Sequence, residues 1–199
     1  MNRRSAALVI AVVAAAFVVG WLLFSTLPRW YYARQHPAIP APTTAATPGA
    51  PRRTIKATLV YAAADAQHLV GVSRDVELGD TPLEQAQRIL DAQLREAAPN
   101  ELLATIPAKT SLRGVYVTDR GEAYVDLSVE VSSAHPGGSL NEILTVYTIV
   151  HALTANLPAI KAVQILVDGR EVDTLAGHVD LRRPLQPILA LMETKSESS

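Results

Sequence analysis

Histidine, aspartate and arginine side chains gather near the carboxyl end of the chain in a spacing that could support acid–base chemistry. The segment GHVDLRRPL, residues 177–185, places His178 two positions before an aspartate and four before the first of two arginines. A histidine oriented by an aspartate can act as a general base, but a base needs a nucleophile or a polarised water within reach. The charged residues near His178 are Asp173, Asp180, Arg182 and Arg183.

The motifs that would supply such a nucleophile or water are absent from the body of the sequence. It contains no Gly-x-Ser-x-Gly elbow, no His-Glu-x-x-His helix and no Ser-x-x-Lys pair. We therefore predict a structural role for the segment: Gly177 allows a bend, His178 bonds to backbone and Pro184 ends the segment. We predict no catalytic residue.

Two carboxylates, Asp126 and Glu130, suggest a second chemistry, because glycan cleavage uses a pair of acids about 5 to 9.5 Å apart. Their separation of four positions along the sequence is poor evidence for such a pair, and capping of the loop after Leu127 explains Asp126 without catalysis. A cell-wall glycan hydrolase is nevertheless kept as an alternative, and it requires both acids to share a concave pocket.

The histidines of the chain show no metal-ligand spacing. They are His36, His68, His135, His151 and His178. Because the chain also has no cysteine, we predict no metal and no cofactor. His151 falls beside an apolar helical stripe and is expected to be a hydrogen-bonded boundary residue, whereas His135, in a Pro-Gly-Gly loop, is expected to be solvated.

Length and composition are those of one ordinary domain with an accessory segment. The chain has 199 residues, of which 49% are hydrophobic and 19% charged. Up to Arg52 every charged side chain is an arginine, so all 19 acidic residues lie in the remainder, which is mildly acidic. A protein that binds phosphate backbones would concentrate Lys and Arg on one face, so we expect no nucleic-acid partner.

An uncharged apolar run from Ala6 to Leu27 predicts a transmembrane helix. At about 1.5 Å per residue the run covers roughly 33 Å, which matches the hydrocarbon core of a bilayer. The alternative is a cleaved signal peptide with its cleavage site at residues 14–16, but the apolar run continues well past Ala16. The aromatic residues toward the far end of the run, where the membrane interface is expected, are Trp21, Trp30, Tyr31 and Tyr32.

The segments around this run set the expected topology. Residues 1–5 are expected in the cytoplasm, because few residues precede the run and the large hydrophilic body follows it. Residues 28–53 form a juxtamembrane and proline-rich linker, since its prolines deny the backbone both helix and ladder hydrogen bonds. The body would then lie on the extracytoplasmic side, with residues 188–199 as a tail.

The first half of the body predicts two strands and a helix. Residues 54–62 alternate and are rich in β-forming residues, and residues 68–78 give a second, weaker strand. A helix follows, with its N-cap at Asp80 or Thr81 and its stop at Pro99. Its expected apolar stripe is Leu83, Ala86, Leu90, Leu94 and Ala97.

The second half begins with a hairpin and a second helix. Two alternating runs, residues 112–118 and 122–127, are joined at residues 119–121, where Gly121 can take the positive φ of a tight turn. The helix is expected to open with Ser139 as its N-cap and Glu142 completing a capping box. Its apolar stripe, ended by a proline at 158, is Leu140, Ile143, Leu144, Tyr147, Val150, Leu153 and Leu157.

A last strand over residues 161–167 and a type I′ turn at Asp168-Gly169 complete the body. The order β-β-α-β-β-α-β predicts a single small α/β (α+β) domain over residues 54–187. In it two helices would pack on one face of a mixed or antiparallel sheet.

Four stretches of the body together resemble the GerMN domain family of sporulation and spore germination proteins. They are LVYAAADAQHLVGVSRDV, ATIPAKTSLRGVYVTDRGEAYVDLS, GGSLNEILTVYTIVHALTANL and VQILVDGREVDTLAGHVDLRRPL, which cover roughly residues 54–185. The specificity lies in the order of the Ile-Pro turn, the Val-Asp-Leu-Ser hairpin end, the Gly-Gly-Ser helix start and the Gly-His-x-Asp finish. Two features depart from relatives: the chain has no cysteine for lipidation, and one copy of the domain replaces a tandem pair.

The resemblance implies a bacterial, extracytoplasmic, non-enzymatic module that supports assembly of an envelope complex, similar in shape to the small domains that build secretion rings. The leading hypothesis is therefore a single-pass membrane protein that binds itself or other envelope proteins. Its contact is expected at a strand edge near residues 54–61 or on the outer face of either helix. A small-ligand sensor is a further alternative, and it would need an apolar cavity between helices and sheet.

Overall fold

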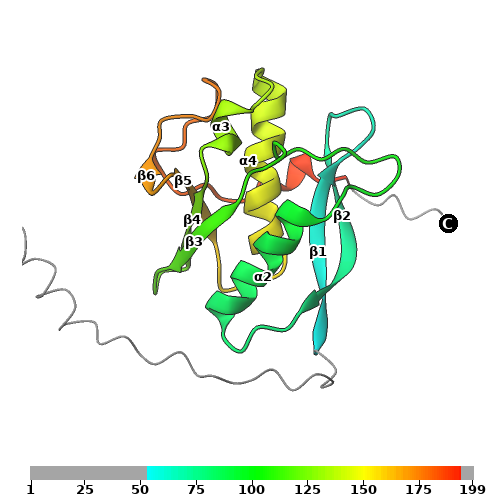
Figure 1. Cartoon of the computed structure of the whole chain (residues 1–199), viewed down its shortest axis with the longest axis vertical. Coiled ribbons are helices and arrows are strands. Elements are labelled where there is room, and N and C mark those ends of the chain that lie inside the picture. The colour runs from blue at the N-terminus through cyan, green and yellow to red at the C-terminus, as the bar shows by residue number, and fades with distance from the viewer. Residues whose placement is uncertain (1–52, 194–199) are drawn as a thin grey trace, which may run out of the picture. The chain divides into compact units, whose positions relative to one another are not determined.

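Two long helices lie between a two-stranded sheet and a four-stranded sheet in the computed structural model of the chain, which describes residues 53–193 (Figure 1). The helices α2 (Pro82–Arg95) and α4 (Ser139–Thr154) contact strands of both sheets. The mixed α and β composition agrees with the predicted fold class. The arrangement of the strands in two sheets does not, because one sheet with both helices on one face was expected.

The first sheet is the hairpin of β1 (Thr54–Ala62) and β2 (Leu69–Glu77), close to the two predicted strands. The strands pair antiparallel along their whole length, from Thr54 opposite Glu77 to Ala62 opposite Leu69. The inward side of β1 is fully apolar, because Leu59 and Tyr61 are buried. The hairpin therefore covers the side of the helices that lies away from the larger sheet (Figure 1).

The first helix begins as predicted, and Ala86 and Leu90 of its expected stripe are buried, but the buried face is broader than that stripe. The Thr81 hydroxyl accepts a hydrogen bond from the Glu84 amide at 3.1 Å, as an N-cap does. Leu83, expected in the apolar stripe, is 42% exposed. The buried face instead includes the glutamines Gln85 and Gln93, whose amides bond to backbone, and pattern reading discounts such polar residues.

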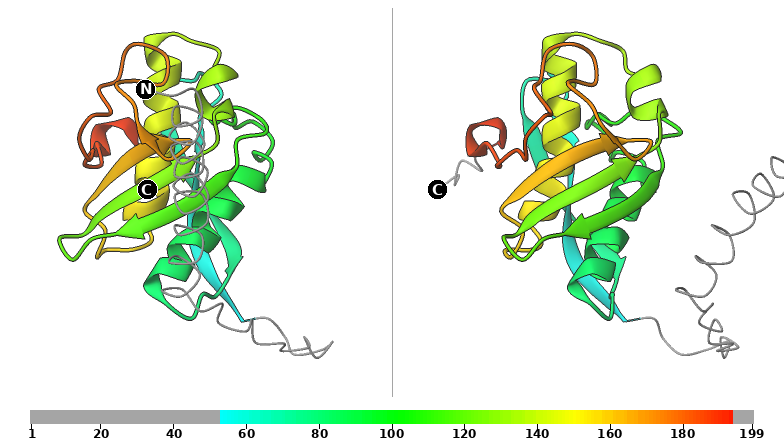
Figure 2. Two further views of the ribbon diagram at one scale, coloured as in Figure 1. Left: turned by 60° about the vertical axis from the view of Figure 1, so that its left-hand side comes forward. Right: turned by 90° about the vertical axis from the view of Figure 1, so that its left-hand side faces the viewer.

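The larger sheet has the order β3-β4-β5-β6, with its open face toward the viewer in the right panel of Figure 2. The predicted hairpin is confirmed as β3 (Leu112–Val117) and β4 (Glu122–Leu127), and Gly121 has a φ of 81° at its turn. Beyond β4 comes β5 (Ala162–Val167), which runs parallel to it.

The far edge of this sheet is closed by two short segments. The type I′ turn is confirmed, because Asp168 and Gly169 have φ values of 49° and 73° and lead into β6 (Arg170–Glu171). Leu185 then forms an isolated bridge with Val163, with N–H···O distances of 2.9 and 2.8 Å. The edge of β5 is therefore occupied at both of its ends.

The second long helix is correctly located, but its predicted capping box is wrong. Ser139 is the first helical residue, and Gly138 takes the N-cap position without any side-chain cap. The Glu142 side chain leaves the helix start and binds the loop around residue 176. A short helix that the pattern had not predicted, α3 (Glu130–Ser133), precedes it, and a 3-10 turn, η1 (Leu189–Leu191), follows the Leu185 bridge.

Burial on nearly every side of α4 explains why a single apolar stripe described it poorly. The helix packs against β1 on one side and β5 on the other, so even Thr145 and Thr148 are buried. Thr145 donates a hydrogen bond to the Thr105 carbonyl at 2.6 Å, and Thr148 bonds to the Thr105 hydroxyl at 2.8 Å. These bonds attach the long loop after α2 to the helix, whereas Leu140 of the expected stripe is exposed.

Side-chain amides bond to the edge of β1 that does not pair with β2, where a further strand could otherwise lie. The Asn156 amide accepts from the Thr58 N–H at 2.7 Å and donates to its carbonyl at 2.8 Å. Gln93 does the same for Val60, at 2.7 and 2.8 Å. A backbone bridge between Ala62 and Leu103 continues the series. A strand edge near residues 54–61 was expected to be open for binding, and within this stretch it is occupied at Thr58 and Val60.

Several expectations fall on residues 1–52 and 194–199, which lie outside the described part of the chain. They include the cytoplasmic residues 1–5, the apolar run Ala6–Leu27 and nearly all of the linker. Between residues 53 and 193 no helix has the length and apolar character that crossing a bilayer requires.

Replacement of Gln93 by alanine tests the side-chain closure of β1. The change leaves the buried N–H and C=O of Val60 without partners, so we expect the free energy of unfolding to fall by about 2–3 kcal/mol. Urea unfolding followed by circular dichroism measures the change. Gln87, half-buried on the same helix, is the control, and its replacement by alanine should cost less than about 0.5 kcal/mol. An equal effect of both changes would contradict the closure.

Candidate functional site

The segment with the most suggestive chemistry, around His178, is tied to the buried carboxylate of Glu142. One carboxylate oxygen accepts hydrogen bonds from the N–H groups of Leu175 at 2.8 Å and Ala176 at 2.9 Å. The other accepts from the His178 N–H at 2.8 Å and lies 3.2 Å from the same residue's ring Nδ1. The Glu142 side chain has no solvent exposure. Glu142 therefore holds residues 175–178 against the first turn of α4.

The electrostatics of this site keep the carboxylate ionised. Burial alone would raise the pKa of Glu142, but backbone N–H groups of Ala176, His178, Leu175 and Val179 oppose it, and the net pKa is lowered from 4.5. Gly177 has a φ of 97°, so the predicted bend is confirmed and gives the loop its concave row of N–H groups. His178 therefore helps to bind a buried anion, through its backbone N–H and its ring Nδ1.

The aspartate next to His178 has a different partner. Asp180 accepts hydrogen bonds from Arg182 at 2.9 Å to Nε and 2.8 Å to Nη2. These bonds from Arg182 hold the pKa of Asp180 well below its usual range. Asp173 uses its backbone carbonyl to accept the Leu181 N–H at 2.8 Å. The His-Asp arrangement that the spacing suggested is therefore replaced by an arginine–aspartate pair and backbone contacts.

The carboxylates considered for glycan cleavage also have structural partners. Asp126 accepts the Gly169 N–H at 2.7 Å and Arg113 Nε at 3.2 Å, so it fixes the turn after β5 and not the loop after its own strand. Glu130 lies in the first turn of α3, and a hydrogen bond from the Ser128 side chain lowers its pKa. Asp126 and Glu130 line neither of the two hollows described below.

The remaining histidines hold segments together. His151 is buried, its Nε2 lies 3.1 Å from the Ile188 carbonyl, and burial lowers its pKa. His135 was expected to be solvated, but one ring nitrogen lies 3.1 Å from the Thr145 hydroxyl and the other accepts the Gly137 N–H at 3.0 Å. Over residues 53–193 no group of three potential metal ligands occurs, and His36 falls outside that range.

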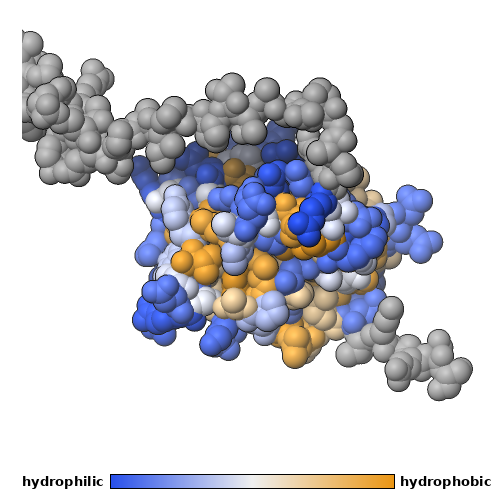
Figure 3. Space-filling view, turned by 90° about the horizontal axis from the view of Figure 1, so that it is seen from below, coloured by the Kyte–Doolittle hydropathy of each residue, from blue (hydrophilic) through white to orange (hydrophobic). Residues whose placement is uncertain are grey.

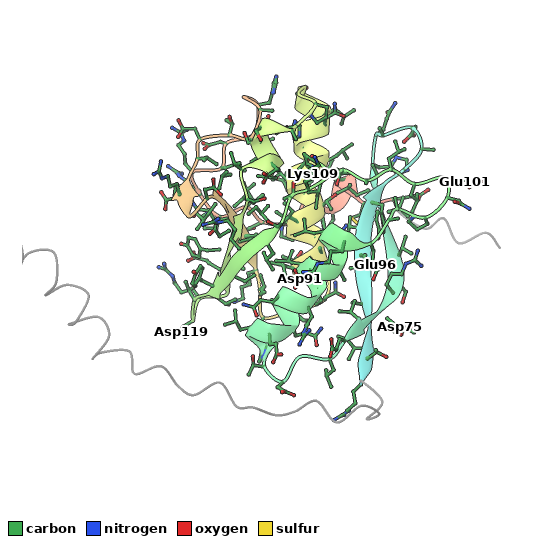
Figure 4. All side chains as sticks on the ribbon, in the orientation of Figure 1. Asp75, Asp91, Glu96, Glu101, Lys109 and Asp119 are labelled. Atoms are coloured by element: carbon green, nitrogen blue, oxygen red, sulfur yellow. The ribbon has the colours of Figure 1, made fainter. Side chains whose placement is uncertain are left out.

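Two hollows of the surface differ from a small-molecule site. A recess of about 90 Å³ lies beside the start of α4, between Leu103, Thr105 and Asn141. A shallow groove of about 290 Å³ runs between β2 and α2, where Figure 4 labels Asp75, Asp91 and Glu96. Its charges are paired, since Arg95 bonds to Asp91 and an arginine of β2 lies near Glu96. Ligand pockets are usually apolar and about 300–1,000 Å³.

The outer edge of β3 combines unpaired backbone groups with exposed apolar side chains. On this strand Tyr116 is 63% exposed and Val117 41% exposed, and the exposed Leu83 lies on α2, which packs against β3. Val117 directs its N–H and C=O groups away from β4, and within residues 53–193 no hydrogen bond to these groups occurs. Val115 points the same way but is only 3% exposed. We call the strand segment Val115–Val117 with Leu83 the β3 edge.

The other exposed strand edge, on β2, also has outward N–H and C=O groups without a hydrogen bond within residues 53–193, at Gly71, Ser73 and Asp75, but it lacks exposed apolar side chains. The Leu69 carbonyl accepts the Glu193 N–H at 2.8 Å, and Lys56 bonds to Asp75 at 2.9 Å. No large exposed hydrophobic residue occurs on this strand. Seen from below, the molecule shows hydrophobic side chains gathered between hydrophilic ones on the surface to which the β3–β4 hairpin and the start of α2 belong (Figure 3). The β3 edge is therefore the candidate binding surface.

Sequence and structure comparisons agree on the type of domain. The Germane family model, described as sporulation and spore germination, matches residues 58–173. The structure of tandem GerMN domains of the sporulation protein GerM from Bacillus subtilis is similar, with a TM-score of 0.56 and 19% identity over 67% of this chain and 46% of that one. The first GerMN domain alone gives a TM-score of 0.51 and 20% identity over 67% of this chain and 98% of that one.

These comparisons establish the fold and the family of one domain. This chain spans about half the length of the tandem structure, so one such domain corresponds to the described residues. At these identities the solved structures establish the fold, and the family model covers more than half of the chain. No curated protein matches the sequence.

Replacement of Glu142 by glutamine tests the anion clasp. The amide keeps the shape but removes the charge and presents an N–H group to N–H donors, so we expect the free energy of unfolding at pH 7 to fall by about 2–4 kcal/mol. Because the pKa of Glu142 is lowered in the folded protein, its stabilisation is full above about pH 4.5 and is lost as the pH falls below that value.

Urea unfolding of the parent and of Glu142→Gln at pH 7 and about pH 3 isolates the contribution of the ionised carboxylate. The difference in the free energy of unfolding between the two proteins should shrink at the lower pH. Glu101→Gln, on an exposed loop, is the matched control and should change stability by less than about 0.5 kcal/mol. A Glu142→Gln protein as stable as the parent at pH 7 would contradict the clasp.

Proposed function

The chain belongs to the Germane family of sporulation and spore germination domains, and from this premise we propose that it is a non-enzymatic module that binds other proteins of a bacterial envelope complex. The β3 edge is the observation that carries the proposal. A strand with open backbone groups and exposed apolar side chains can receive a further strand, and the backbone hydrogen bonds then provide affinity.

The partners of the histidine and aspartate side chains that could have been catalytic support a binding role. His178, Asp126 and Asp180 are each engaged with a structural partner: Glu142, the turn after β5 and Arg182. Asp126 is also mostly buried, with 11% of its side chain exposed, whereas a catalytic acid or base needs access to a substrate. The relatives of known structure are named as sporulation domains and not as enzymes.

The proposal includes a membrane anchor and an extracytoplasmic location. Its support is the uncharged run Ala6–Leu27 and the proline-rich linker that follows, in a sequence that offers no cysteine for lipidation. The domain would then be tethered at a distance from the bilayer, where proteins of the envelope are within reach. Its partners are proposed to be envelope proteins or further copies of the chain.

Cysteine labelling in intact cells tests the location. Because the natural chain has no cysteine, Ser133→Cys, at the exposed end of α3, provides a single thiol. We expect a membrane-impermeant maleimide to label the full-length variant in intact cells as completely as in lysed cells. A control with cysteine at Ser5, before the apolar run, should react only after lysis. Protection of both positions until lysis would contradict the proposed topology.

Photo-crosslinking tests the binding surface. The full chain carries a benzophenone amino acid in place of Tyr116, and a matched chain carries it in place of Ser73 on the β2 edge. We expect defined covalent adducts with envelope proteins or with another copy from position 116, and far fewer from position 73. If no adduct forms from position 116 in cells that make the protein naturally, the proposal that the β3 edge binds other proteins is wrong.

A further inference from the structure

We infer that the chain's own carboxyl-terminal segment, residues 194–199, completes the edge of β2 as a parallel third strand of the β1–β2 hairpin. This edge has outward N–H and C=O groups at Gly71, Ser73 and Asp75, and none of them has a hydrogen bond within residues 53–193. The inference does not depend on the proposed binding function, because the β3 edge belongs to the other sheet. We call residues 194–199 the tail.

The described part of the chain ends on this edge. Leu69, the first residue of β2, forms an isolated bridge with Met192, and its carbonyl accepts the Glu193 N–H at 2.8 Å. The approach to the bridge is fixed as well, because Nε2 of the buried His151 lies 3.1 Å from the Ile188 carbonyl. The turn η1, red in Figure 1, therefore delivers the chain to the beginning of β2.

The bridge sets the direction of the tail. It is parallel, so the chain leaves Glu193 in the direction in which β2 runs from Leu69 toward Asp75. As a strand, the six residues of the tail would span roughly 20 Å, which is enough to reach Asp75. A strand from another molecule would find the Leu69 end of the edge already occupied, whereas the tail is attached there and has a high effective concentration.

The hydrogen bond at Leu69 sets the register. In a parallel ladder a residue bonds through its N–H and its C=O to the two residues that flank its partner, and the pattern repeats every second residue. The Lys195 N–H would therefore donate to the Gly71 carbonyl, and the Glu197 N–H to the Ser73 carbonyl. The neighbouring pairs are then Gly71 with Thr194, Ser73 with Ser196, and Asp75 with Ser198.

Side chains on one face fit this register. Met192 lies over Gly71, since a Cβ at Gly71 would be 3.7 Å from the Met192 Cε and 2.8 Å from the Thr58 methyl group. The absence of a side chain at Gly71 therefore leaves room for the segment to cross β2. Further along, Ser196 would lie beside Ser73, and hydroxyl side chains of neighbouring strands can hydrogen-bond to each other.

Charges on the other face also fit. Glu197 would lie beside Arg74, which has the opposite charge. The Arg74 side chain lies 3.5 Å from Glu96 and is 37% exposed, so a second carboxylate can reach it from the edge. Lys195 and Glu197 would then flank the new edge of the sheet, and charged side chains on an edge strand discourage pairing with further molecules.

Paired cysteines test the register directly. The natural chain has none, so Ser73→Cys with Ser196→Cys in the full chain gives two thiols on the same face of neighbouring strands. Their Cα atoms would be about 4.8 Å apart, which is within the range of a disulfide. After mild oxidation in dilute solution, mass spectrometry of the digested chain should find about fivefold more of this intramolecular disulfide than with Lys195→Cys or Glu197→Cys as the partner. Those two side chains would point to the opposite face.

Proline substitutions in the tail provide the second measurement. Glu197→Pro removes the N–H that would donate to the Ser73 carbonyl, whereas Ser196→Pro, the matched control, removes an N–H that would point away from β2. Hydrogen exchange with mass spectrometry should show that a peptide covering residues 70–76 exchanges severalfold faster in Glu197→Pro than in the parent. The same peptide in Ser196→Pro should exchange at nearly the parent rate.

The outcomes distinguish a paired tail from one that is merely attached. A disulfide that favours position 196, together with faster exchange in Glu197→Pro, supports the inference. Equal yields at positions 195, 196 and 197 overturn it, because a tail without a register would reach Ser73 from any of them. A missing disulfide at position 196, or unchanged exchange in Glu197→Pro, overturns it as well.

Discussion

Every buried backbone N–H and C=O group needs a hydrogen-bond partner, and the way this chain meets that requirement determines its shape. Gln93 and Asn156 replace a missing strand along β1, each with one acceptor and one donor. Glu142 collects the N–H groups of a loop that has no strand beside it. These three side chains lie on or just after the two long helices, so the helices position both the separate β1–β2 hairpin and the carboxyl-terminal loop.

The same requirement leaves open edges on β2 and β3, and exposed apolar side chains occur only on the second of these. The outer edge of β1 is closed by amides, and the edge of β5 is closed by β6 and Leu185. On β3 the outward groups of Val117 have no such partner within the described residues, and Val117 and the adjacent Tyr116 are exposed. An open, apolar strand edge is a liability for a protein that works alone, so its presence is most simply explained by a strand from another molecule. A membrane tether would assist such pairing, because it confines copies of the chain to one surface.

Local patterns predicted the elements well, and long-range polar contacts explain what they missed. The alternation in β1, the Gly121 hairpin and the Asp168-Gly169 turn depend on neighbouring residues, so the sequence alone was enough for them. Gln93 bonds to Val60 and Glu142 bonds to Leu175, and in both pairs the two residues are 33 positions apart in the sequence. No local pattern signals contacts at such a distance. The predictions of a capping box at Ser139 and of a single sheet were both wrong for this reason. The candidate site was missed too: attention went to histidines and carboxylates, while the relevant signal was an exposed tyrosine and valine in a short strand.

The central claim is that association completes the β3 edge. Hydrogen exchange of the full chain, followed by mass spectrometry at low and high protein concentration, tests it most directly, because outward amides exchange slowly only when a strand covers them. The account predicts that a peptide covering residues 112–118 gains protection as concentration rises, while a peptide covering residues 70–76 of β2 does not. Exchange of residues 112–118 that is the same at every concentration, in a sample shown by light scattering to associate, would contradict it.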